Sequence, residues 1–410
     1  MSINVETTDR PVTPGFLFLQ GPHGFFFPRL GAVLAARGAR VRRINLTGGD
    51  QATWPGQCCY RGTAAGWPGY VRAFLARERI TDLVVHGDCR PYHEVAIAAA
   101  RAAGARVHVF EEGYLRPDWI TLERDGVNGR STMPADPAWF RARAAALPPP
   151  PPAPTIPPHA AARRWGAFFY YAQTTLRRWG FPFGPDHRVR HPIWEGLSYL
   201  AKFRRAHAER ADSARAFERL ADRPFMLFPL QLDSDYQMRA HSPFGGTRAA
   251  ARFVLESFRA HAPADLVLVV KEHPLDSGLI RWRPVFEAFA DEFELDGRLL
   301  FVEHGDLQAL VEASRGMVTV NSTSGTTALA AGKPVAVLGR AVYDIDKLTD
   351  RRSLDAFWSA PTPPDPALFD AFSRVLADRC LIRGAFLGDL SDRMLAAAAD
   401  RLLAGCEAEP

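Results

Sequence analysis

The chain has 410 residues, of which 47% are hydrophobic and 23% are charged, a composition typical of globular proteins. At roughly 150 residues per domain, this length predicts two or three domains and excludes a small disulfide-stapled or disordered protein. The net charge of +5 is a small excess of 50 basic over 45 acidic residues, so it does not indicate a nucleic-acid-binding protein. The five cysteines show no zinc-binding spacing, and we expect them to be reduced and buried.

The beginning of the chain does not resemble a secretion signal. Residues 1–14 contain Glu6, Asp9 and two prolines, where a signal peptide has a basic end and an apolar run. The longest apolar runs, such as Leu266 to Val270, are far shorter than the roughly 18 residues of a membrane-spanning helix. We therefore expect a cytoplasmic protein whose membrane contact is peripheral.

Apolar runs alternate with helical patterns in the first third of the chain, which predicts a parallel sheet with helices between its strands. The predicted strands are 16–20, 41–45, 83–86 and 107–110, and the predicted helices are 30–37, 67–79 and 94–103. Ligands of such sheets bind at the carboxyl ends of the strands. The polar residues found there are His23, Asp88 and the pair Glu111 and Glu112.

A second block of the same kind follows a proline-rich segment, Leu147 to Pro158, which has too few backbone donors for a helix interior or a central strand. Its predicted strands are 225–229, 266–270, 299–302, 317–320 and 335–338, and its predicted helices are 247–260, 307–313 and 325–331. The segment 366–403 is predicted to be helical.

These patterns predict an α/β protein with two Rossmann-like domains that face a central cleft, and with C-terminal helices that cross back to the first domain. The predicted parts are an N-terminal Rossmann-like domain, a proline-rich linker with a basic and aromatic helical segment, a C-terminal Rossmann-like domain and the C-terminal helices. The N-terminal domain spans residues 13–147 and the linker with the helical segment spans 148–222. The C-terminal domain spans 223–345 and the C-terminal helices span 346–410.

A hydroxyl-rich segment lies between the strand that ends at Val320 and the next helix. Backbone N–H groups, hydroxyls and a helix N-terminus at a strand end can bind a phosphate, although such a segment can also be an ordinary helix cap. Lys271 and His273 end another strand of this block and could neutralise the phosphate or donate a proton to it. The candidate phosphate ligands are Lys271, His273, Asn321, Ser322, Thr323, Ser324, Gly325 and Thr326.

Two pairs of acidic residues are candidates for catalysis. Glu111 and Glu112 end a strand whose alternation directs their side chains to opposite faces, so at most one of them faces the cleft. Asp233 and Asp235 follow the first strand of the second block. The second pair could be catalytic, could bind a nucleotide-bound divalent metal ion, or could be simple loop acids.

The stretch Arg163 to Trp179 mixes arginines with large aromatic residues over roughly five helical turns. This pattern suits the surface of a membrane that contains anionic lipids. It is equally typical of core aromatics flanked by solvated arginines, and the sequence does not separate the two interpretations.

The order of the Glu111-Glu112-Gly113, His273-Pro274 and Ser322-Thr323-Ser324 elements resembles the three motifs of bacterial CMP-sugar sialyltransferases of the GT-B fold. More specifically, residues 15–345 resemble the capsular polysaccharide synthesis and export family of the KpsS and KpsC type. The matching segments are Gly21-Pro22-His23-Gly24-Phe25-Phe26, Gly87 to His93, Phe110 to Asp118 and Pro229 to Gln237. A single module of this length favours the KpsS-like role.

This resemblance implies a GT-B enzyme that transfers the keto-sugar acid Kdo from CMP-β-Kdo, with retention, to a (lyso)phosphatidylglycerol-type lipid. It places the protein at the inner face of the inner membrane, with other capsule biosynthesis and export proteins as partners. It implies Asp235 as nucleophile and Glu112 as acid/base, with Asp233 and Glu111 as the alternatives. No metal or redox cofactor is implied, and CMP-Kdo is the donor substrate.

The same motifs imply the residues that contact the substrates, which are Gly21, His23, Gly24, Asp88, Arg90, His93, Arg116, Gln231 and Gln237. Two other functions fit this resemblance. One is a GT-B glycosyltransferase that uses a different nucleotide sugar, and the other is a non-catalytic protein of capsule export or assembly.

Overall fold

The computed structural model describes residues 13–150, 160–184, 192–233, 236–387 and 390–404. The chain forms two compact units, neither of which is continuous in sequence. The first unit comprises residues 1–110, 158–185 and 384–410, and the second comprises residues 111–157 and 186–383. This division differs from the predicted one, because residues 111–147, with the acidic pair, belong to the second unit.

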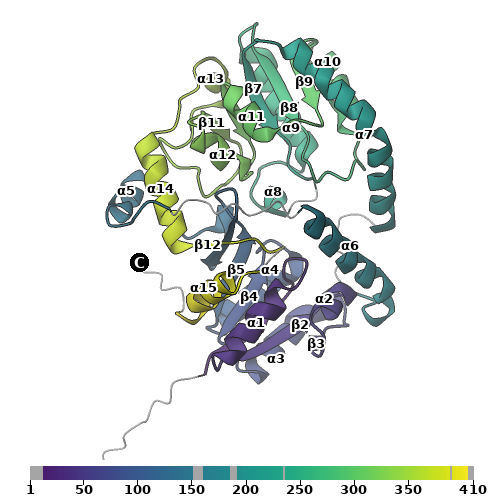
Figure 1. Cartoon of the computed structure of the whole chain (residues 1–410), viewed down its shortest axis with the longest axis vertical. Helices are drawn as coiled ribbons and strands as arrows, with labels where there is room; N and C mark the ends of the chain where they lie inside the picture. The colour runs from purple at the N-terminus through teal and green to yellow at the C-terminus, as the bar shows by residue number, and fades with distance from the viewer. Residues whose placement is uncertain (1–12, 151–159, 185–191, 234–235, 388–389, 405–410) are drawn as a thin grey trace, which may run out of the picture. The chain divides into compact units, whose positions relative to one another are not determined.

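The first unit contains a parallel sheet with the strand order β5-β4-β1-β2-β3 (Figure 1). Phe16 in the middle of β1 pairs with Val41 of β2 and Asp82 of β4, so the predicted strands lie side by side in register. The strands are β1 (Gly15–Phe18), β2 (Arg40–Asn45), β3 (Cys58–Cys59), β4 (Asp82–His86) and β5 (Arg106–Glu112), which crosses to the second unit after Phe110. The helices are α1 (Phe26–Ala36), α2 (Gly48–Thr53), α3 (Trp67–Arg77), α4 (Pro91–Ala102), α6 (Ala160–Leu176) and α15 (Asp392–Leu403), with short 3₁₀ turns η1 (Ala64–Gly66) and η3 (Arg178–Gly180).

The second unit contains a parallel sheet with the strand order β11-β10-β7-β8-β9. Its strands are β7 (Phe225–Pro229), β8 (Val267–Lys271), β9 (Leu299–Val302), β10 (Gly316–Thr319) and β11 (Val335–Val337), and β6 (Trp119–Arg124) pairs antiparallel with β12 (Leu381–Arg383). Its helices are α5 (Pro137–Ala144), α7 (Pro192–Leu220), α8 (Tyr236–Ala240), α9 (Thr247–His261), α10 (Trp282–Glu292), α11 (Leu307–Ala313), α12 (Ser324–Ala330), α13 (Leu354–Ser359) and α14 (Pro366–Arg379), with a 3₁₀ turn η2 (Asn128–Arg130).

The strands of the second unit are continuous apolar runs because they are buried in the core of this unit. All five residues of β8 are buried, as expected for a strand covered on both faces of a parallel sheet. Val270 belongs to one cluster with Trp282 and Phe286 of α10 and with Trp358 of α13. The predicted α/β class with two parallel sheets is confirmed.

The C-terminal segment returns to the first unit through α15, as predicted. This helix packs on α1, and Asp392 and Asp400 pair with Arg29 and Arg37 along the contact. The predicted helical segment 366–403 is helical in α14 and α15, but the unpredicted strand β12 separates the two helices. The apolar Leu381 and Ile382 are buried in the pairing with β6, which favours a strand there.

The cysteines only partly follow the expectation. All four within the described residues are free thiols, and Cys89 and Cys380 are buried. Cys58 is exposed, because it lies in the two-residue edge strand β3, where one side of the strand has no neighbour. Cys406 lies outside the described residues.

A buried polar network joins α6 to the sheet of the first unit. The Asp50 carboxylate accepts hydrogen bonds from Arg43 of β2 (3.1 Å) and from the Tyr170 hydroxyl of α6 (3.1 Å). It also accepts from Gln20 (3.0 Å) and from the backbone N–H of Thr47 (3.0 Å), which completes a capping box at the start of α2. Burial lowers the pKa of Arg43, although the charge of Asp50 opposes this shift.

Replacing Asp50 with Ala should destabilise the first unit by about 3–5 kcal/mol, because the buried Arg43 guanidinium would lose its counter-charge. Urea-dependent hydrogen exchange of the amides in β2 and α2 would measure this loss. Asp392→Ala is the control, since it removes an exposed ion pair and should leave the same amides nearly unchanged. Equal effects of the two substitutions would show that the Asp50 network does not hold this unit together.

Candidate functional site

The acidic pair lies at the end of β5, as the sequence predicts. Glu112 accepts a hydrogen bond from Arg116 at 3.1 Å, and Glu111 accepts one from the backbone N–H of Glu112 at 3.1 Å. Both carboxylates are partly exposed. A Cβ on the following Gly113 would lie 2.3 Å from the carbonyl oxygen of Trp119, so only glycine fits where the chain turns back into β6.

A buried tyrosine holds the segment that follows the acidic pair. The Tyr114 hydroxyl donates to the Glu123 carboxylate and accepts from the backbone N–H of Asn128. Burial, assisted by the charge of Glu123, raises the pKa of Tyr114 well above its ordinary value, so the hydroxyl stays protonated. Ser131 donates a second hydrogen bond to Glu123. The chain between β5 and η2 is therefore fixed by hydrogen bonds inside the second unit.

The same segment is bonded to the predicted phosphate loop. Thr326 donates its hydroxyl to the carbonyl of Tyr114, and Asn128 donates its side-chain amide to the carbonyl of Asn321 at 3.4 Å. Asn321 also exchanges two hydrogen bonds with Gln231, at 2.7 and 3.0 Å. The side chains of Asn321, Thr326 and Gln231 are buried and used in this framework. Their predicted contacts with a ligand remain predictions.

Ser322, Thr323 and Ser324 are the partly exposed hydroxyls of this loop, which joins β10 to α12. Ser322 accepts hydrogen bonds from the backbone N–H of Ser324 (3.2 Å) and from its hydroxyl (3.0 Å). The Gly325 backbone lies against Tyr343, where a Cβ would be 2.4 Å from the phenol oxygen. Since α12 has only seven residues, the loop hydroxyls and N–H groups, more than a helix dipole, would hold an anion.

Lys271 is the last residue of β8, the strand end that the sequence predicts. Its ammonium is buried and donates to the carbonyls of Glu272 (2.8 Å) and Glu303 (2.9 Å), which ties the end of β8 to the end of β9. Burial lowers the pKa of this ammonium. The neighbouring Glu272 is paired with Lys202 at 2.7 Å, and burial raises its pKa to about 7. Phosphate binding by Lys271 stays a prediction, and its observed role is structural.

His273 is a neutral hydrogen-bond donor. Its Nδ1 accepts from the backbone N–H of Leu275 at 3.1 Å, so the proton of the neutral ring is on Nε2. Burial lowers the pKa of His273 to about 4. The negative charge of Asp276 raises this pKa, whereas the positive charges of Lys271, Lys202 and Arg116 lower it further. Since Arg116 also binds Glu112, it connects the electrostatics of the histidine with those of the acidic pair.

Of the two aspartates of the second pair, only Asp233 is among the described residues. Asp233 accepts a hydrogen bond from the backbone N–H of Thr247 at 3.2 Å and so caps the start of α9 from a distant part of the chain. Asp235, the predicted nucleophile, lies outside the described residues. Gln237 is in α8, but its side chain is not described either.

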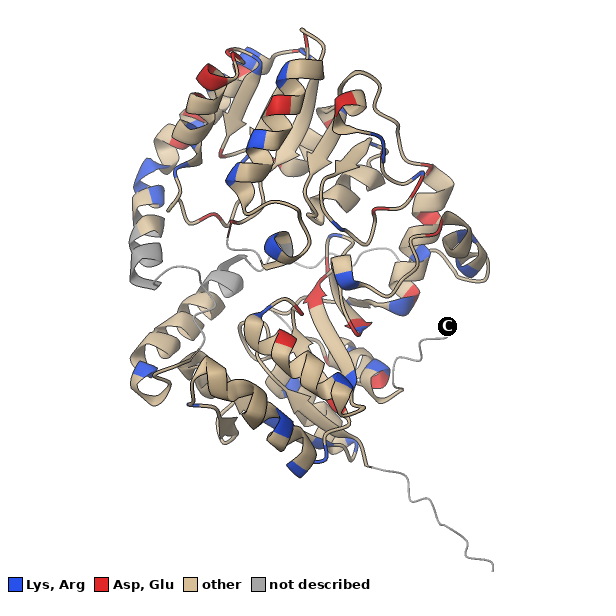
Figure 2. Cartoon of the chain, turned by 180° about the vertical axis from the view of Figure 1, so that it is seen from behind, with Lys and Arg blue, Asp and Glu red and all other residues tan. Residues whose placement is uncertain are grey.

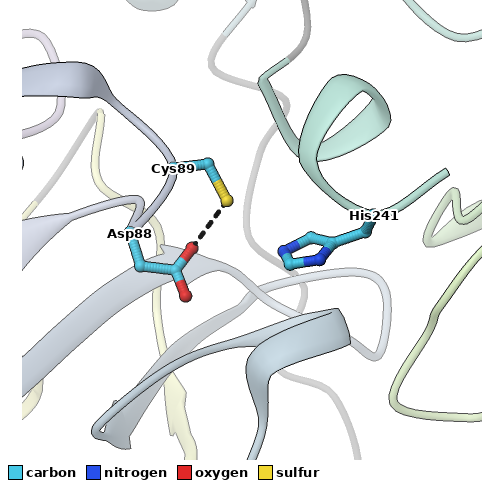
Figure 3. A group of neighbouring side chains, drawn as sticks. All are labelled: Asp88, Cys89 and His241. Atoms are coloured by element: carbon cyan, nitrogen blue, oxygen red, sulfur yellow. Dashed lines mark hydrogen bonds between the residues drawn. The ribbon is translucent and has the colours of Figure 1, made fainter. Parts of the chain in front are cut away.

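The predicted substrate residues of the first unit gather at the carboxyl ends of β1 and β4. Gly21, His23 and Gly24 follow β1, and the His23 ring packs on Tyr170 and Tyr171 of α6, with ring centroids 4.8 and 5.1 Å apart. After β4, Cys89 donates its thiol hydrogen to Asp88 at 3.1 Å (Figure 3). His93 donates from Nδ1 to the carbonyl of Gly87 at 2.7 Å.

Sequence reasoning missed His86, the last residue of β4. Its Nδ1 accepts from Arg90 at 3.1 Å, which leaves the proton on Nε2, a buried atom with no hydrogen-bond partner among the described residues. Burial, with the charges of Arg90, His23 and His93, lowers the pKa of His86 well below its ordinary value. Its position at a strand end beside Gly87 was the available signal.

The predicted site residues thus fall into two groups. The second unit contains Glu111, Glu112, Arg116, Asp233, Lys271, His273 and the loop 321–326. Hydrogen bonds connect Glu112 with Arg116 and the loop with the backbone of Tyr114, whereas those of Asp233, Lys271 and His273 go to other residues. Gly21, His23, Gly24, Asp88, Arg90 and His93 belong to the first unit. The predicted meeting of both groups in one cleft stays a prediction.

A family model described as capsule polysaccharide biosynthesis protein matches residues 81–387. The chain is 34% identical over 382 residues to the capsule polysaccharide modification protein LipB of Neisseria meningitidis serogroup A. This alignment covers 90% of this chain and 91% of LipB. It is 33% identical over 362 residues to the capsule polysaccharide export protein KpsS of Escherichia coli, covering 87% and 92% of the two chains. Among solved structures, the β-Kdo 2,7 transferase KpsC of Thermosulfurimonas dismutans aligns over 95% of this chain and 99% of its own, with 15% identity and a TM-score of 0.43.

The protonation of His273 can be tested directly. In the free protein, NMR of labelled histidine should show a ring that stays neutral at neutral pH and titrates near pH 4, with His273→Gln identifying the signal. A bound phosphate favours the charged ring, so a nucleoside monophosphate should raise this pKa toward 6.5. A free-protein pKa near 6.5, or no response to the nucleotide, would contradict the assignment of His273 as a neutral donor.

Proposed function

This chain belongs to the capsule polysaccharide biosynthesis protein family, and on that basis we propose that it is a glycosyltransferase of capsule assembly. Its donor is CMP-β-Kdo, and its acceptor is a phosphatidylglycerol-type lipid at the inner face of the inner membrane. The observation that carries this proposal is the hydrogen bonding of the acidic segment to the hydroxyl loop, by Thr326 to Tyr114 and by Asn128 to Asn321. These hydrogen bonds hold a pair of carboxylates and the hydroxyl groups that could bind a phosphate in one framework.

The donor phosphate would bind to the hydroxyls of Ser322, Thr323 and Ser324 and to the Nε2–H of His273. When the bond between the sugar and the phosphate breaks, the phosphate oxygen keeps the electron pair and gains negative charge. A neutral donor already aimed at that oxygen stabilises the charge without a proton transfer. The structure supports this role for His273 because Leu275 fixes the ring tautomer.

Retention requires two displacements at the anomeric carbon. In the first, the Asp235 carboxylate forms a bond to that carbon and CMP leaves with the electron pair. In the second, the acceptor hydroxyl oxygen attacks the same carbon, Glu112 takes the hydroxyl proton, and the Asp235 carboxylate is released. The capping bond of Asp233 to Thr247 favours Asp235 as the nucleophile, since Asp233 is already used to hold α9.

The residues of the first unit would bind the acceptor. Arg90 carries a permanent positive charge, and the Nε2–H of His86 is a donor without an acceptor among the described residues. Together with His23 and His93 they suit a phosphate headgroup. No metal ion or redox cofactor takes part in the proposed reaction.

Asp235→Ala should abolish Kdo transfer while CMP binding stays nearly intact, because the nucleophile contacts the sugar and not the nucleotide. Purified protein, CMP-Kdo and a fluorescent phosphatidylglycerol would be followed by mass spectrometry, with CMP binding measured by calorimetry. Asp233→Asn is the matched control and should lower stability but keep transfer. The reverse pattern would make Asp233 the nucleophile.

Glu112→Gln should likewise slow transfer by about two to four orders of magnitude, the usual contribution of a general base. Glu111→Gln is its control, and an equal loss in both would contradict the assignment. Transfer from other CMP- or UDP-sugars in place of CMP-Kdo would show a different donor, and absence of transfer from all of them would favour a non-catalytic assembly protein.

His273→Gln and Ser324→Ala should each weaken CMP binding by about 1–3 kcal/mol, because a hydrogen bond to a charged phosphate is lost. A chelator should leave both CMP binding and transfer unchanged. Full loss of transfer with the chelator, and recovery of transfer with magnesium or manganese, would contradict the metal-free reaction. It would indicate that Asp233 and Asp235 are metal ligands.

A further inference from the structure

Among the described side chains of α6, those that contact the first unit lie on one face of the helix. On that face Tyr170 is buried against Asp50 and Thr47, and Thr174 accepts a hydrogen bond from the backbone N–H of Gly49 at 3.1 Å. A Cβ on Gly48 would lie 2.6 Å from the backbone oxygen of Gln173, so α2 and α6 are in close contact (Figure 1). These contacts fix the position of α6 on this unit.

The opposite face of α6 and the following turn expose large apolar side chains. The exposed fractions are 70% for Trp165, 65% for Phe168, 42% for Phe169 and 72% for Leu176. Trp179 of η3 (96%) and Phe183 just after it (55%) add to them. The four helix positions have the spacing i, i+3, i+4 and i+11, which places them on one side of an α-helix. The anchored positions Tyr170 and Thr174 lie on the other side.

The charge of this segment has one sign. Residues 160–184 contain four arginines and no acidic residue, although the chain as a whole has 45. In Figure 2 no part of the α6 ribbon has the red of Asp and Glu. Arg177 and Arg178 are exposed beside Trp179. An apolar face flanked only by arginines is complementary to an anionic surface with an apolar interior.

We propose that this basic-aromatic face, formed by Trp165, Phe168, Phe169, Leu176, Arg177, Arg178, Trp179 and Phe183, binds in the plane of an anionic lipid bilayer. The aromatic rings sit at the depth of the headgroups and the two guanidinium groups bind lipid phosphates. No helix among the described residues is long and apolar enough to cross a bilayer.

The loop after β1 extends the same region. Phe25 is 53% exposed, and His23 two residues before it packs on Tyr170 and Tyr171 of α6. Leu387 lies beside both Gly24 of this loop and Gly166 of α6, at 3.0 and 3.3 Å from where their Cβ atoms would be. The loop that carries predicted substrate residues therefore lies next to the face that would contact lipid. The proposal itself does not depend on the proposed reaction.

Sedimentation of the full chain with vesicles tests the proposal without any nucleotide sugar. The protein should bind vesicles that contain phosphatidylglycerol and should bind pure phosphatidylcholine weakly. The double variants Arg177→Glu/Arg178→Glu and Trp179→Ala/Phe183→Ala should each bind the anionic vesicles at least about tenfold more weakly. Salt near 1 M should mimic the arginine variant, because it shortens the screening length to about 3 Å.

Matched controls separate this face from charge or apolar surface in general. Arg72→Glu/Arg393→Glu makes the same change of net charge at exposed positions of the first unit, and Phe203→Ala/Phe253→Ala removes exposed aromatics of the second unit. Both controls should bind like the unmodified chain, and circular dichroism should show that every variant is folded.

Two results would overturn the proposal. The first is that the unmodified chain does not sediment with anionic vesicles, and the second is that the two face variants bind as well as their controls. If sedimentation equilibrium instead shows self-association that the face variants abolish, with no vesicle binding, the occupant of the face is a second copy of this chain. Because no step uses a sugar donor, a failure here leaves the proposed activity to its own tests.

Discussion

The candidate donor site depends on one residue, Asn128, which is held in the left-handed region at a φ of 53°. In this conformation its backbone N–H donates to Tyr114, its side-chain amide donates to Asn321, and its side-chain oxygen accepts from Val342 at 3.2 Å. Asparagine tolerates positive φ better than most residues, and its side chain has both a donor and an acceptor. Three segments of the second unit are thereby joined at a buried point, and the acidic pair and the hydroxyl loop take their positions from it.

The sequence was sufficient for most of the fold because its signals are local. The strands β1, β4, β7 and β8 are four or five residues long, and their apolar residues are buried. Strands of this kind in alternation with helices leave few arrangements other than a parallel sheet. The position of the polar residues at the carboxyl ends follows from the same argument. The short strand β12 was missed because three residues between two helices give too little pattern to detect.

The sequence could not separate residues that bind a ligand from those that hold the site. Lys271 and His273 are two positions apart at the end of one strand. The buried ammonium of Lys271 donates to two backbone carbonyls, whereas His273 accepts at Nδ1 and carries its proton on Nε2. Asp233 caps a helix that starts fourteen positions later. In each case the outcome depends on which distant groups the fold brings near, and residue type and spacing carry no information about that.

The return of α15 to α1 makes the order of folding differ from the order of synthesis. The ion pair between Arg29 and Asp392 joins positions 363 residues apart, and the whole second unit is translated between them. A nascent chain can therefore complete the second unit while the apolar surface of α1 that α15 covers is still open. Apolar surface that is exposed on a folding intermediate promotes aggregation or chaperone binding. The first unit is consequently the part of this protein whose maturation depends most on how quickly the ribosome reaches residue 403.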